Sequence, residues 1–304
     1  SSSEEQQTGL NQISGIPKFH LAERAFFNSQ TNAVERTYTY LNDGPDWHIT
    51  LPEVSQEDGI ISSLLAVRKS VLRIGILYEH KSTTQMLFGS GCLLTDRLIL
   101  TYAHNFDVLL WGMERVPYSR IYVCFCDPAC ESLFSLLNPS HMLSESSLLS
   151  RGLVHDNLSK YDEVSGQITD LAILQLNTPV SHGQRNEFLR PKMNSLSTLS
   201  RSSINSKLYL VGYNGELIEQ SELDPYKHLK GFGTSTIDKL NFNHNANHKS
   251  ISIGRFIQES SSDSLYATHN CSTLSGSGGA LMLDSEGNFA GIHIGVSKSR
   301  LNKK

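Results

Sequence analysis

The chain has 304 residues, of which 38% are hydrophobic and 18% are charged, and its net charge is -4. This composition is typical of a globular protein long enough for two domains with cores, and it excludes an intrinsically disordered chain. The charge gives no sign of a nucleic-acid surface, and every apolar run is far shorter than the roughly 20 residues that span a bilayer. We therefore expect neither a nucleic-acid partner nor a membrane span.

Five cysteines occur in the chain, an odd and sparse set that does not resemble a secreted disulfide framework. Cys124, Cys126 and Cys130 are close in sequence, but their spacing fits no zinc pattern and no fourth ligand stands at a suitable distance. The polar N-terminus lacks the charged and apolar regions of a signal peptide. We expect free thiols, no metal, no cofactor, and an intracellular, cytoplasmic location rather than secretion. The oligomeric state stays open.

Residues 1–65 show weak periodicity and many turn residues, which predicts an N-terminal extension with a short helix over 22–28 and regulation as a candidate role. A Ser- and Leu-rich stretch over 127–168 predicts a surface insertion, and the polar stretch over 177–206 predicts a linker. Between these segments, short runs of β-branched and aliphatic residues are typical of strands. Strands are predicted over 71–78, 98–102, 121–125, 171–176, 208–213, 231–237, 251–256 and 265–268. Many short strands with little helical periodicity favour a barrel or a sandwich.

The segment CSTLSGSGGALMLDSEGNFAGIHIGV, residues 271–296, predicts a tight loop followed by a β-hairpin. Ser277 lies between two glycines in this loop, and glycine tolerates backbone angles that other residues avoid. Such a loop can present a serine hydroxyl beside several backbone N–H groups, as a nucleophile with an oxyanion hole requires. Most Gly-Ser-Gly turns are only turns, so the loop alone does not establish catalysis.

Two further residues complete a constellation in the chain order His, Asp, Ser. His104 follows the predicted strand 98–102, and Asp170 heads the apolar run 171–176. A serine hydroxyl is a weak nucleophile until a base accepts its proton. Imidazole titrates near neutral pH, and a buried carboxylate holds the ring in the required tautomer. Taken singly, His104 is compatible with a structural histidine and Asp170 with a turn residue.

Around these residues the sequence resembles the chymotrypsin-like serine proteases. GSG at 89–91, with the run that ends in TYAH at 101–104, is similar to the strand, turn and "T-A-A-H" of that superfamily. DLAIL at 170–174 is similar to its "D-[IL]-A-[LV]-[LV]", and SGSGGA at 275–280 to its "G-D-S-G-G-P". The resemblance covers about residues 70–296, and the three motifs are specific in combination.

The resemblance implies an all-β fold of two six-stranded barrels, with the active site in the cleft between them. It divides the chain into an N-terminal extension over 1–65, a first barrel over 66–185 that contains the insertion, and a second barrel over 186–304. The first barrel would carry the histidine and the aspartate, and the second would carry the serine. The implied roles are Ser277 as nucleophile, His104 as general base and then acid, and Asp170 as the carboxylate that orients His104.

The nucleophile loop departs from the family pattern. Gly276 stands where trypsin-like zymogens carry an aspartate, so activation by insertion of a new N-terminus is not expected. Ser275 stands where the family has a glycine, in an oxyanion hole assigned here to Ser275, Gly276 and Ser277. The Ser275 side chain restricts its peptide, and a flipped peptide would leave the hole unformed. Asn105 stands where secreted members place a disulfide cysteine, which fits a non-secreted branch.

GIHIG at 291–295 resembles the "G-I-H-x-G" strand of staphylococcal glutamyl endopeptidases and picornavirus proteases. In those families the histidine lines the primary specificity pocket, with a serine or threonine before the nucleophile. An imidazole and a hydroxyl can hydrogen-bond a Glu or Gln side chain, so we predict cleavage of proteins or peptides after Glu or Gln. The alternatives are that the histidine belongs to the core, and that the chain is a weak or inactive binding module. The implied substrate-binding residues are Ser272, Thr273, His293, Ile294 and Gly295.

Overall fold

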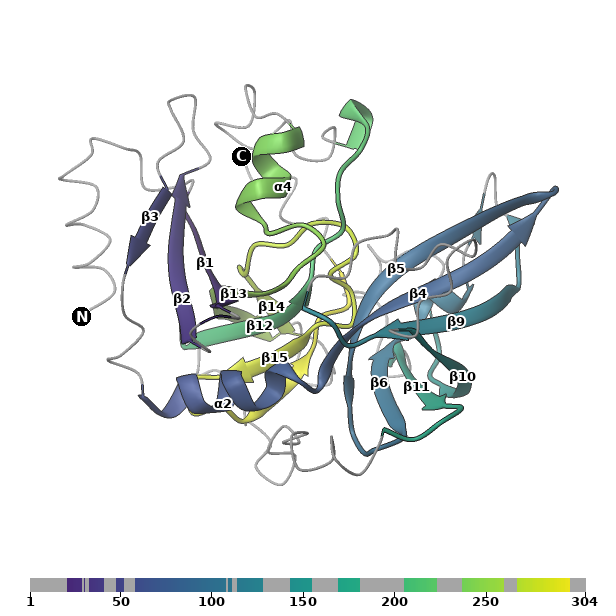
Figure 1. Cartoon of the computed structure of the whole chain (residues 1–304), viewed down its shortest axis with the longest axis horizontal. Coiled ribbons are helices and arrows are strands. Elements are labelled where there is room, and N and C mark those ends of the chain that lie inside the picture. Colours follow the sequence, from purple (N-terminus) through teal and green to yellow (C-terminus); the bar gives the residue numbers. More distant parts are fainter. Residues whose placement is uncertain are drawn as a thin grey trace.

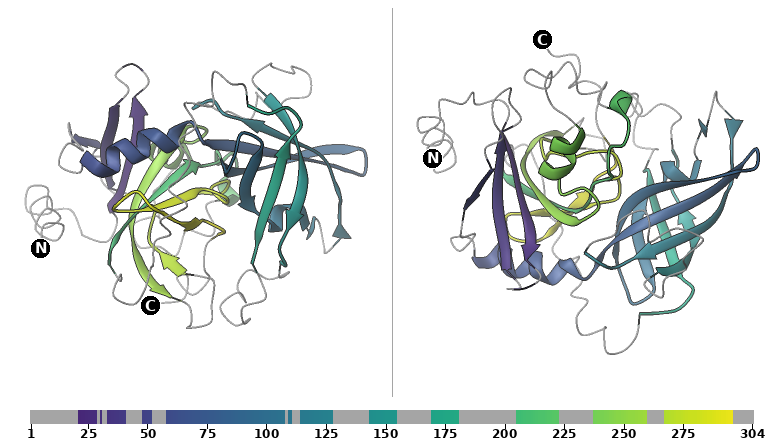
Figure 2. Two further views of the ribbon diagram at one scale, coloured as in Figure 1. Left: turned by 90° about the horizontal axis from the view of Figure 1, so that it is seen from below. Right: turned by 45° about the horizontal axis from the view of Figure 1, so that its top comes forward.

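The computed structural model describes residues 21–28, 30, 33–40, 48–51, 58–107, 109–110, 114–127, 143–154, 169–180, 205–222, 237–259 and 267–295. Within these ranges the chain is mostly β-strand, arranged as a closed barrel and a second large sheet (Figure 1). The two lie side by side in both views of Figure 2. The predicted all-β fold is confirmed: one unit is a closed six-stranded barrel, and the other is an eight-stranded sheet in the described ranges. No helix in the described ranges is long and apolar enough to cross a bilayer.

The first barrel is closed by six antiparallel strands in the order β10-β11-β6-β5-β4-β9. Its interior is aliphatic because one face of each strand points inward, and Ile99, Val123 and Leu174 are fully buried there. The short strands β7 (Leu109–Leu110) and β8 (Glu114–Arg115) pair apart from it. The barrel strands are β4 (Val71–His80), β5 (Thr83–Leu93), β6 (Leu98–Tyr102), β9 (Tyr118–Cys124), β10 (Leu143–Arg151) and β11 (Leu171–Leu176).

The second unit is an eight-stranded sheet in the order β16-β15-β12-β13-β1-β2-β3, with β14 paired to β13. The helix α2 (Asp58–Arg68) packs Ile60, Leu64 and Val67 into its core, at the spacing of one helical face, and then leads into β4 (Figure 1). A second helix, α4 (Ile237–Asn243), precedes β13. The strands are β1 (Leu21–Asn28), β2 (Ala33–Tyr40), β3 (His48–Leu51), β12 (Lys207–Tyr213), β13 (Lys249–Glu259), β14 (Ala267–His269), β15 (Leu281–Asp284) and β16 (Phe289–Ile292).

The prediction of a short helix over 22–28 is wrong, because these residues form strand β1. β1 pairs along its length with β2, and its residues 23–26 pair with 250–253 of β13. Ala, Glu and Arg have high helix propensity, but pairing with a strand far along the chain overrides that local preference. The strands of the predicted N-terminal extension are therefore an integral part of the second sheet. Residues 1–20 lie outside the described ranges.

The prediction of a surface insertion over 127–168 needs correction, because β10 lies within it. β10 pairs with β9 on one side and with β11 on the other, and so closes the first barrel. Its Ser-rich sequence obscures the strand, since most of its side chains are at least partly exposed and Leu149 is 56% exposed. The rest of the predicted insertion (128–142 and 155–168) and most of the predicted linker lie outside the described ranges.

The other predicted strands correspond to observed ones: β6 and β11 have the predicted ends, and the ends of the rest differ by a few residues. The exception is the strand predicted over 231–237, of which only Ile237 is described, and this residue begins α4. The corresponding strands are β4, β6, β9, β11, β12, β13 and β14.

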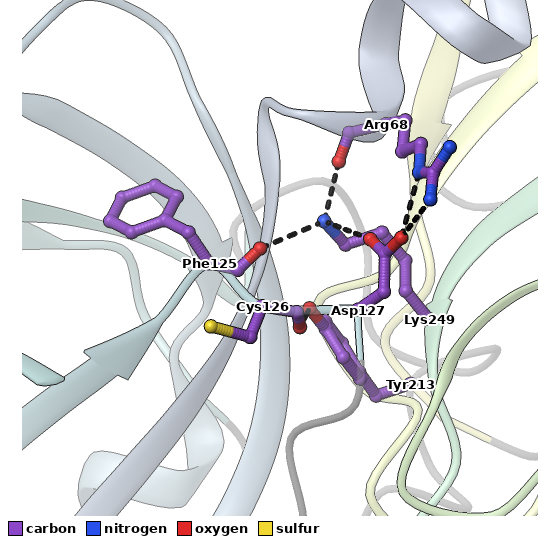
Figure 3. Close-up of polar contacts among 6 residues, drawn as sticks. All are labelled: Arg68, Phe125, Cys126, Asp127, Tyr213 and Lys249. Carbon is purple, nitrogen blue, oxygen red and sulfur yellow. Dashed lines mark hydrogen bonds and ion pairs between the residues drawn. The ribbon is translucent and has the colours of Figure 1, made fainter. Parts of the chain in front are cut away.

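An ionic cluster around the buried Lys249 joins the two units (Figure 3). Lys249 Nζ donates to the backbone oxygens of Arg68 at 2.5 Å and Phe125 at 3.2 Å, and it lies 3.3 Å from Asp127 Oδ1. Arg68 Nε donates to Asp127 Oδ2 at 2.8 Å. Burial lowers the pKa of Lys249 to about 8, although Asp127 opposes this shift. The cluster holds α2, the end of β9 and the start of β13 together, and so fixes the barrel against the sheet.

Candidate active site

His104 and Asp170 meet at one end of the first barrel. His104 begins a short 3-10 helix, His104–Asp107, directly after β6. Asp170 immediately precedes β11, in which Leu171 pairs with Tyr102 of β6. This register brings together two residues that are 66 positions apart, and His104 Nδ1 lies 2.8 Å from Asp170 Oδ2.

The Asp170 carboxylate is fully buried and surrounded by N–H donors. Its Oδ1 accepts the backbone N–H groups of Ala103 at 3.0 Å and His104 at 2.8 Å, while Oδ2 faces the imidazole. An ionised carboxylate can accept all of these hydrogen bonds. The ionised carboxylate can only accept, so the proton of a neutral His104 ring lies on Nδ1 and Nε2 is left as a base. Asp170 has a φ of 41°, in the left-handed region that Asp tolerates better than most residues.

The loop that carries Ser277 rests against the same end of the first barrel. The Ser90 N–H of β5 donates to Gly278 O at 2.7 Å. The Tyr102 ring lies edge-on to the His104 ring, with 4.4 Å between centroids, and a Cβ on Gly278 would come within 2.9 Å of that tyrosine ring. Tyr102 therefore lies against both the His104 ring and the residue after Ser277. Ser277 itself is buried, with 3% exposure.

The backbone of the nucleophile loop closes on itself before Ser277. The Ser277 N–H donates to Leu274 O at 3.3 Å, across a turn with Ser275 and Gly276 at its centre. Gly276 has a φ of 87°, as the third residue of a type II turn requires, whereas Ser275 is not among the positive-φ residues of the described chain. Ser275 O accepts the Gly215 N–H at 2.6 Å. In this conformation the Ser277 N–H is engaged within the loop by the Leu274 carbonyl.

His293 lies beside this loop and forms a pair with His269. Its backbone exchanges two hydrogen bonds with the loop, since its O accepts the Gly279 N–H at 2.7 Å and its N–H donates to Ala280 O at 2.9 Å. His269 Nε2 lies 3.0 Å from His293 Nδ1, and His269 Nδ1 accepts the Cys271 N–H at 3.2 Å. His293 is 4% exposed, and burial, aided by the charge of His104, lowers its pKa to about 4.

These contacts fix the tautomers of both rings. The Cys271 N–H can only donate, so His269 Nδ1 must accept and its proton lies on Nε2. His269 Nε2 therefore donates to His293 Nδ1, and a neutral His293 must carry its own proton on Nε2. The pair thus makes His293 a neutral hydrogen-bond donor.

The other predicted pocket residues flank the two histidines and the loop. Ser272 is partly buried, with its Oγ 3.2 Å from Ser252 Oγ and 3.3 Å from Arg24 Nη1. Thr273 and Ile294 are partly buried as well, and Gly295 is exposed. One neighbour of this region, Arg24, was not predicted from the sequence, whereas His269, the partner of His293, is a second candidate near the pocket that the sequence suggests is structural. For His269 its place just before the loop was a usable signal, whereas Arg24 had none.

No known protein-family profile and no curated protein matches the chain. Similar solved structures include the serine endoprotease from Yersinia pestis, which is 15% identical, with 80% of this chain and 57% of that chain covered and a TM-score of 0.40. The chain thus spans little more than half the length of that protein. A Glu endopeptidase in complex with MPD is also 15% identical, with 76% of this chain and 81% of that chain covered and a TM-score of 0.44.

Proposed function

We propose that this protein is a serine endopeptidase with Ser277 as nucleophile, His104 as general base and Asp170 as the orienting carboxylate. The observation that carries the proposal is the 2.8 Å contact between His104 Nδ1 and Asp170 Oδ2, next to the loop of Ser277. Two backbone N–H groups hold the other carboxylate oxygen, so the carboxylate that orients the ring is itself fixed in place. A base held in this way has its free nitrogen available for a serine proton.

The proposed reaction runs through an acyl-enzyme. His104 Nε2 removes the Ser277 hydroxyl proton while Oγ attacks the peptide carbonyl carbon. The tetrahedral intermediate then collapses, the C–N bond breaks, and the same proton passes from His104 to the leaving amine. Water, deprotonated by His104, hydrolyses the ester and frees Ser277. The N–H groups of Ser275 and Ser277 stabilise the oxyanion once the Leu274 carbonyl has turned away from the Ser277 N–H.

We further propose that the enzyme cleaves after Glu or Gln. The neutral His293 offers an Nε2–H donor, and Ser272 and Thr273 offer hydroxyl groups on the approach to the nucleophile. Donors of this kind favour a side chain that ends in an acceptor oxygen. No Asp or Glu occurs between residues 265 and 277, which argues against a pocket for Lys or Arg on this segment.

Labelling with a fluorophosphonate probe tests the nucleophile. The native chain is expected to react with the probe, and Ser277→Ala is expected not to react. His104→Ala is expected to react far more slowly than the native chain. A truncated chain that lacks residues 1–20 is labelled in parallel. The cut is placed after residue 20 because β1 begins at Leu21 and belongs to the second sheet. Equal labelling of the native chain and Ser277→Ala would assign the reaction to another residue and end the proposal.

One observation favours a second candidate, a protease-fold protein that binds its partner without cleaving it. The Ser277 N–H is already bonded to Leu274 O, which leaves the oxyanion without one of its donors in this conformation. If the loop cannot rearrange, the site is catalytically inert. No labelling of the native chain, of the chain truncated after residue 20, or of a Ser275→Gly variant would support this second function.

A further inference from the structure

We propose that Arg24, on the N-terminal strand β1, is a positioning residue for the substrate pocket: it holds Ser272 so that the hydroxyl proton of Ser272 is presented to a substrate acceptor oxygen. The inference rests on the proposed function, in which Ser272 and His293 bind a Glu or Gln side chain. With this role for Arg24, strand β1 contributes to substrate specificity.

The Arg24 guanidinium connects β13 of the second sheet with the loop between β14 and β15 that leads to Ser277. Its Nη1 donates to Ser272 O at 2.9 Å and to Ser272 Oγ at 3.3 Å, and its Nη2 donates to Ser250 Oγ at 2.6 Å. The register of β1 on β13 produces this placement, because Arg24 pairs with Ser252 and Phe26 pairs with Ser250. Arg24 is 1% exposed, so these contacts are made in the protein interior.

The chemistry of the guanidinium determines what Ser272 can do. A guanidinium has no acceptor, so Ser272 Oγ must accept from Arg24 and keeps its own proton for another partner. Ser252 Oγ lies 3.2 Å away and can donate to Ser272 Oγ, in which case the Ser272 proton is free to point toward a substrate. Together with the Nε2–H of His293, the pocket then offers two donors and selects a side chain with an acceptor oxygen.

The burial of Arg24 supports a role beyond packing. Burial lowers the pKa of Arg24 to about 10, so the charged group is held at a cost that an aliphatic residue would avoid. A lysine could not replace it, because a single ammonium group does not reproduce a planar fork that reaches Ser250 and Ser272 at once.

The test measures peptide binding in the Ser277→Ala background, so that it does not depend on turnover. Acetylated tetrapeptides that end in Glu, Gln or Ala are titrated by calorimetry. The Glu and Gln peptides are expected to bind at least about tenfold more tightly than the Ala peptide, the effect of one well-placed hydrogen bond. Arg24→Met should lose most of this preference and Arg24→Lys about half of it on a logarithmic scale. Ser272→Ala should also lose it, and the Arg24→Met/Ser272→Ala double variant should lose no more than either single change.

Two controls separate positioning from general damage. Lys249→Met removes a different buried cation, at the junction of the barrel and the sheet, and should leave the peptide preference unchanged whatever its effect on stability. Ser250→Ala removes one anchor of the guanidinium and should weaken the preference in part, which provides a readout if Arg24→Met does not fold.

The outcomes are distinguishable. An unchanged preference in folded Arg24→Met, or in Ser250→Ala and Arg24→Lys if Arg24→Met does not fold, overturns the role of Arg24 and leaves the proposed protease intact. Equal binding of all three peptides to Ser277→Ala overturns both this role and the Glu/Gln specificity. Fluorophosphonate labelling reports separately on the nucleophile. A chain that binds Glu peptides but is never labelled would therefore support the substrate pocket and contradict the proposed catalytic activity.

Discussion

The most informative perturbation of the candidate site is Ser275→Gly. The Leu274 carbonyl accepts the Ser277 N–H, so the peptide between Leu274 and Ser275 must rotate before an oxyanion can take that donor. A peptide rotation of roughly 180° changes the φ of the following residue by a similar amount. Because the φ of Ser275 is not positive now, the rotation drives it into the positive region, where a Cβ atom is crowded and glycine is not.

The size of the effect follows from this geometry. A non-glycine residue at positive φ costs about 1–2 kcal/mol, and glycine removes that cost from the open loop only. Since about 1.36 kcal/mol corresponds to a tenfold change in rate, kcat/KM should rise about 5- to 30-fold in Ser275→Gly. The hydrogen bond from Ser277 to Leu274 has to break in both proteins, so it does not contribute to the difference.

The assay is the hydrolysis of a peptide that carries Glu before the scissile bond. Ser275→Ala is the matched variant, because it removes the hydroxyl but keeps the Cβ atom, and it should leave kcat/KM near the native value. Ser285→Gly, in the exposed turn of the last hairpin, shows how an added glycine elsewhere in the chain changes kcat/KM. The reasoning is refuted if Ser275→Gly is no faster than the native chain, or if Ser275→Ala is accelerated as much.

Three further predictions concern the same region. Asp170→Asn should lower kcat by about 10⁴-fold with little loss of stability, because an amide can keep the backbone contacts but no longer fixes the His104 tautomer; a loss below tenfold in a steady-state assay would contradict this. His293 has a folded pKa of about 4 against an ordinary value of 6.5, so the unfolded chain binds more protons between these pH values and stability falls as pH drops through this window. In denaturant unfolding, the free energy of unfolding should fall between pH 7 and pH 4 by about 3 kcal/mol less in His293→Gln than in the native chain. Equal falls in both proteins would argue against a buried neutral ring. Gly279→Ala should destabilise the fold by about 3 kcal/mol or more, since its Cβ would lie 1.8 Å from Ser90 O at a φ of 84°, and a melting temperature within a degree of the native one would be incompatible with that contact.

The sequence predicted the barrel strands best where the strand is a continuous apolar run with clear polar ends. β11 was predicted with its observed ends because LAILQL is a short aliphatic run that follows the charged Asp170 and is itself followed by turn residues. β10 was missed because it is largely exposed and rich in serine, so no alternating pattern marks it. β1 was missed because its pairing with β13 joins residues more than two hundred positions apart, a contact that local propensity does not report.

The candidate site was predictable to the extent that residue types and their flanking motifs identify it. The order of His104, Asp170 and Ser277 with their flanking motifs led to the proposal, and the structure adds the 2.8 Å contact between His104 and Asp170. Ser275 indicated a restricted peptide, but the bond from Ser277 to Leu274 depends on backbone geometry that composition does not encode.

The most direct test of the central proposal is to incubate the native chain, Ser275→Gly and Ser277→Ala with a complex peptide mixture and to sequence the new ends by mass spectrometry. We expect new C-termini at Glu or Gln with the native chain, faster production of the same ends with Ser275→Gly, and none with Ser277→Ala. Cleavage that persists in Ser277→Ala, or no cleavage by either of the other two proteins, would contradict the proposal that Ser277 is the nucleophile of an endopeptidase.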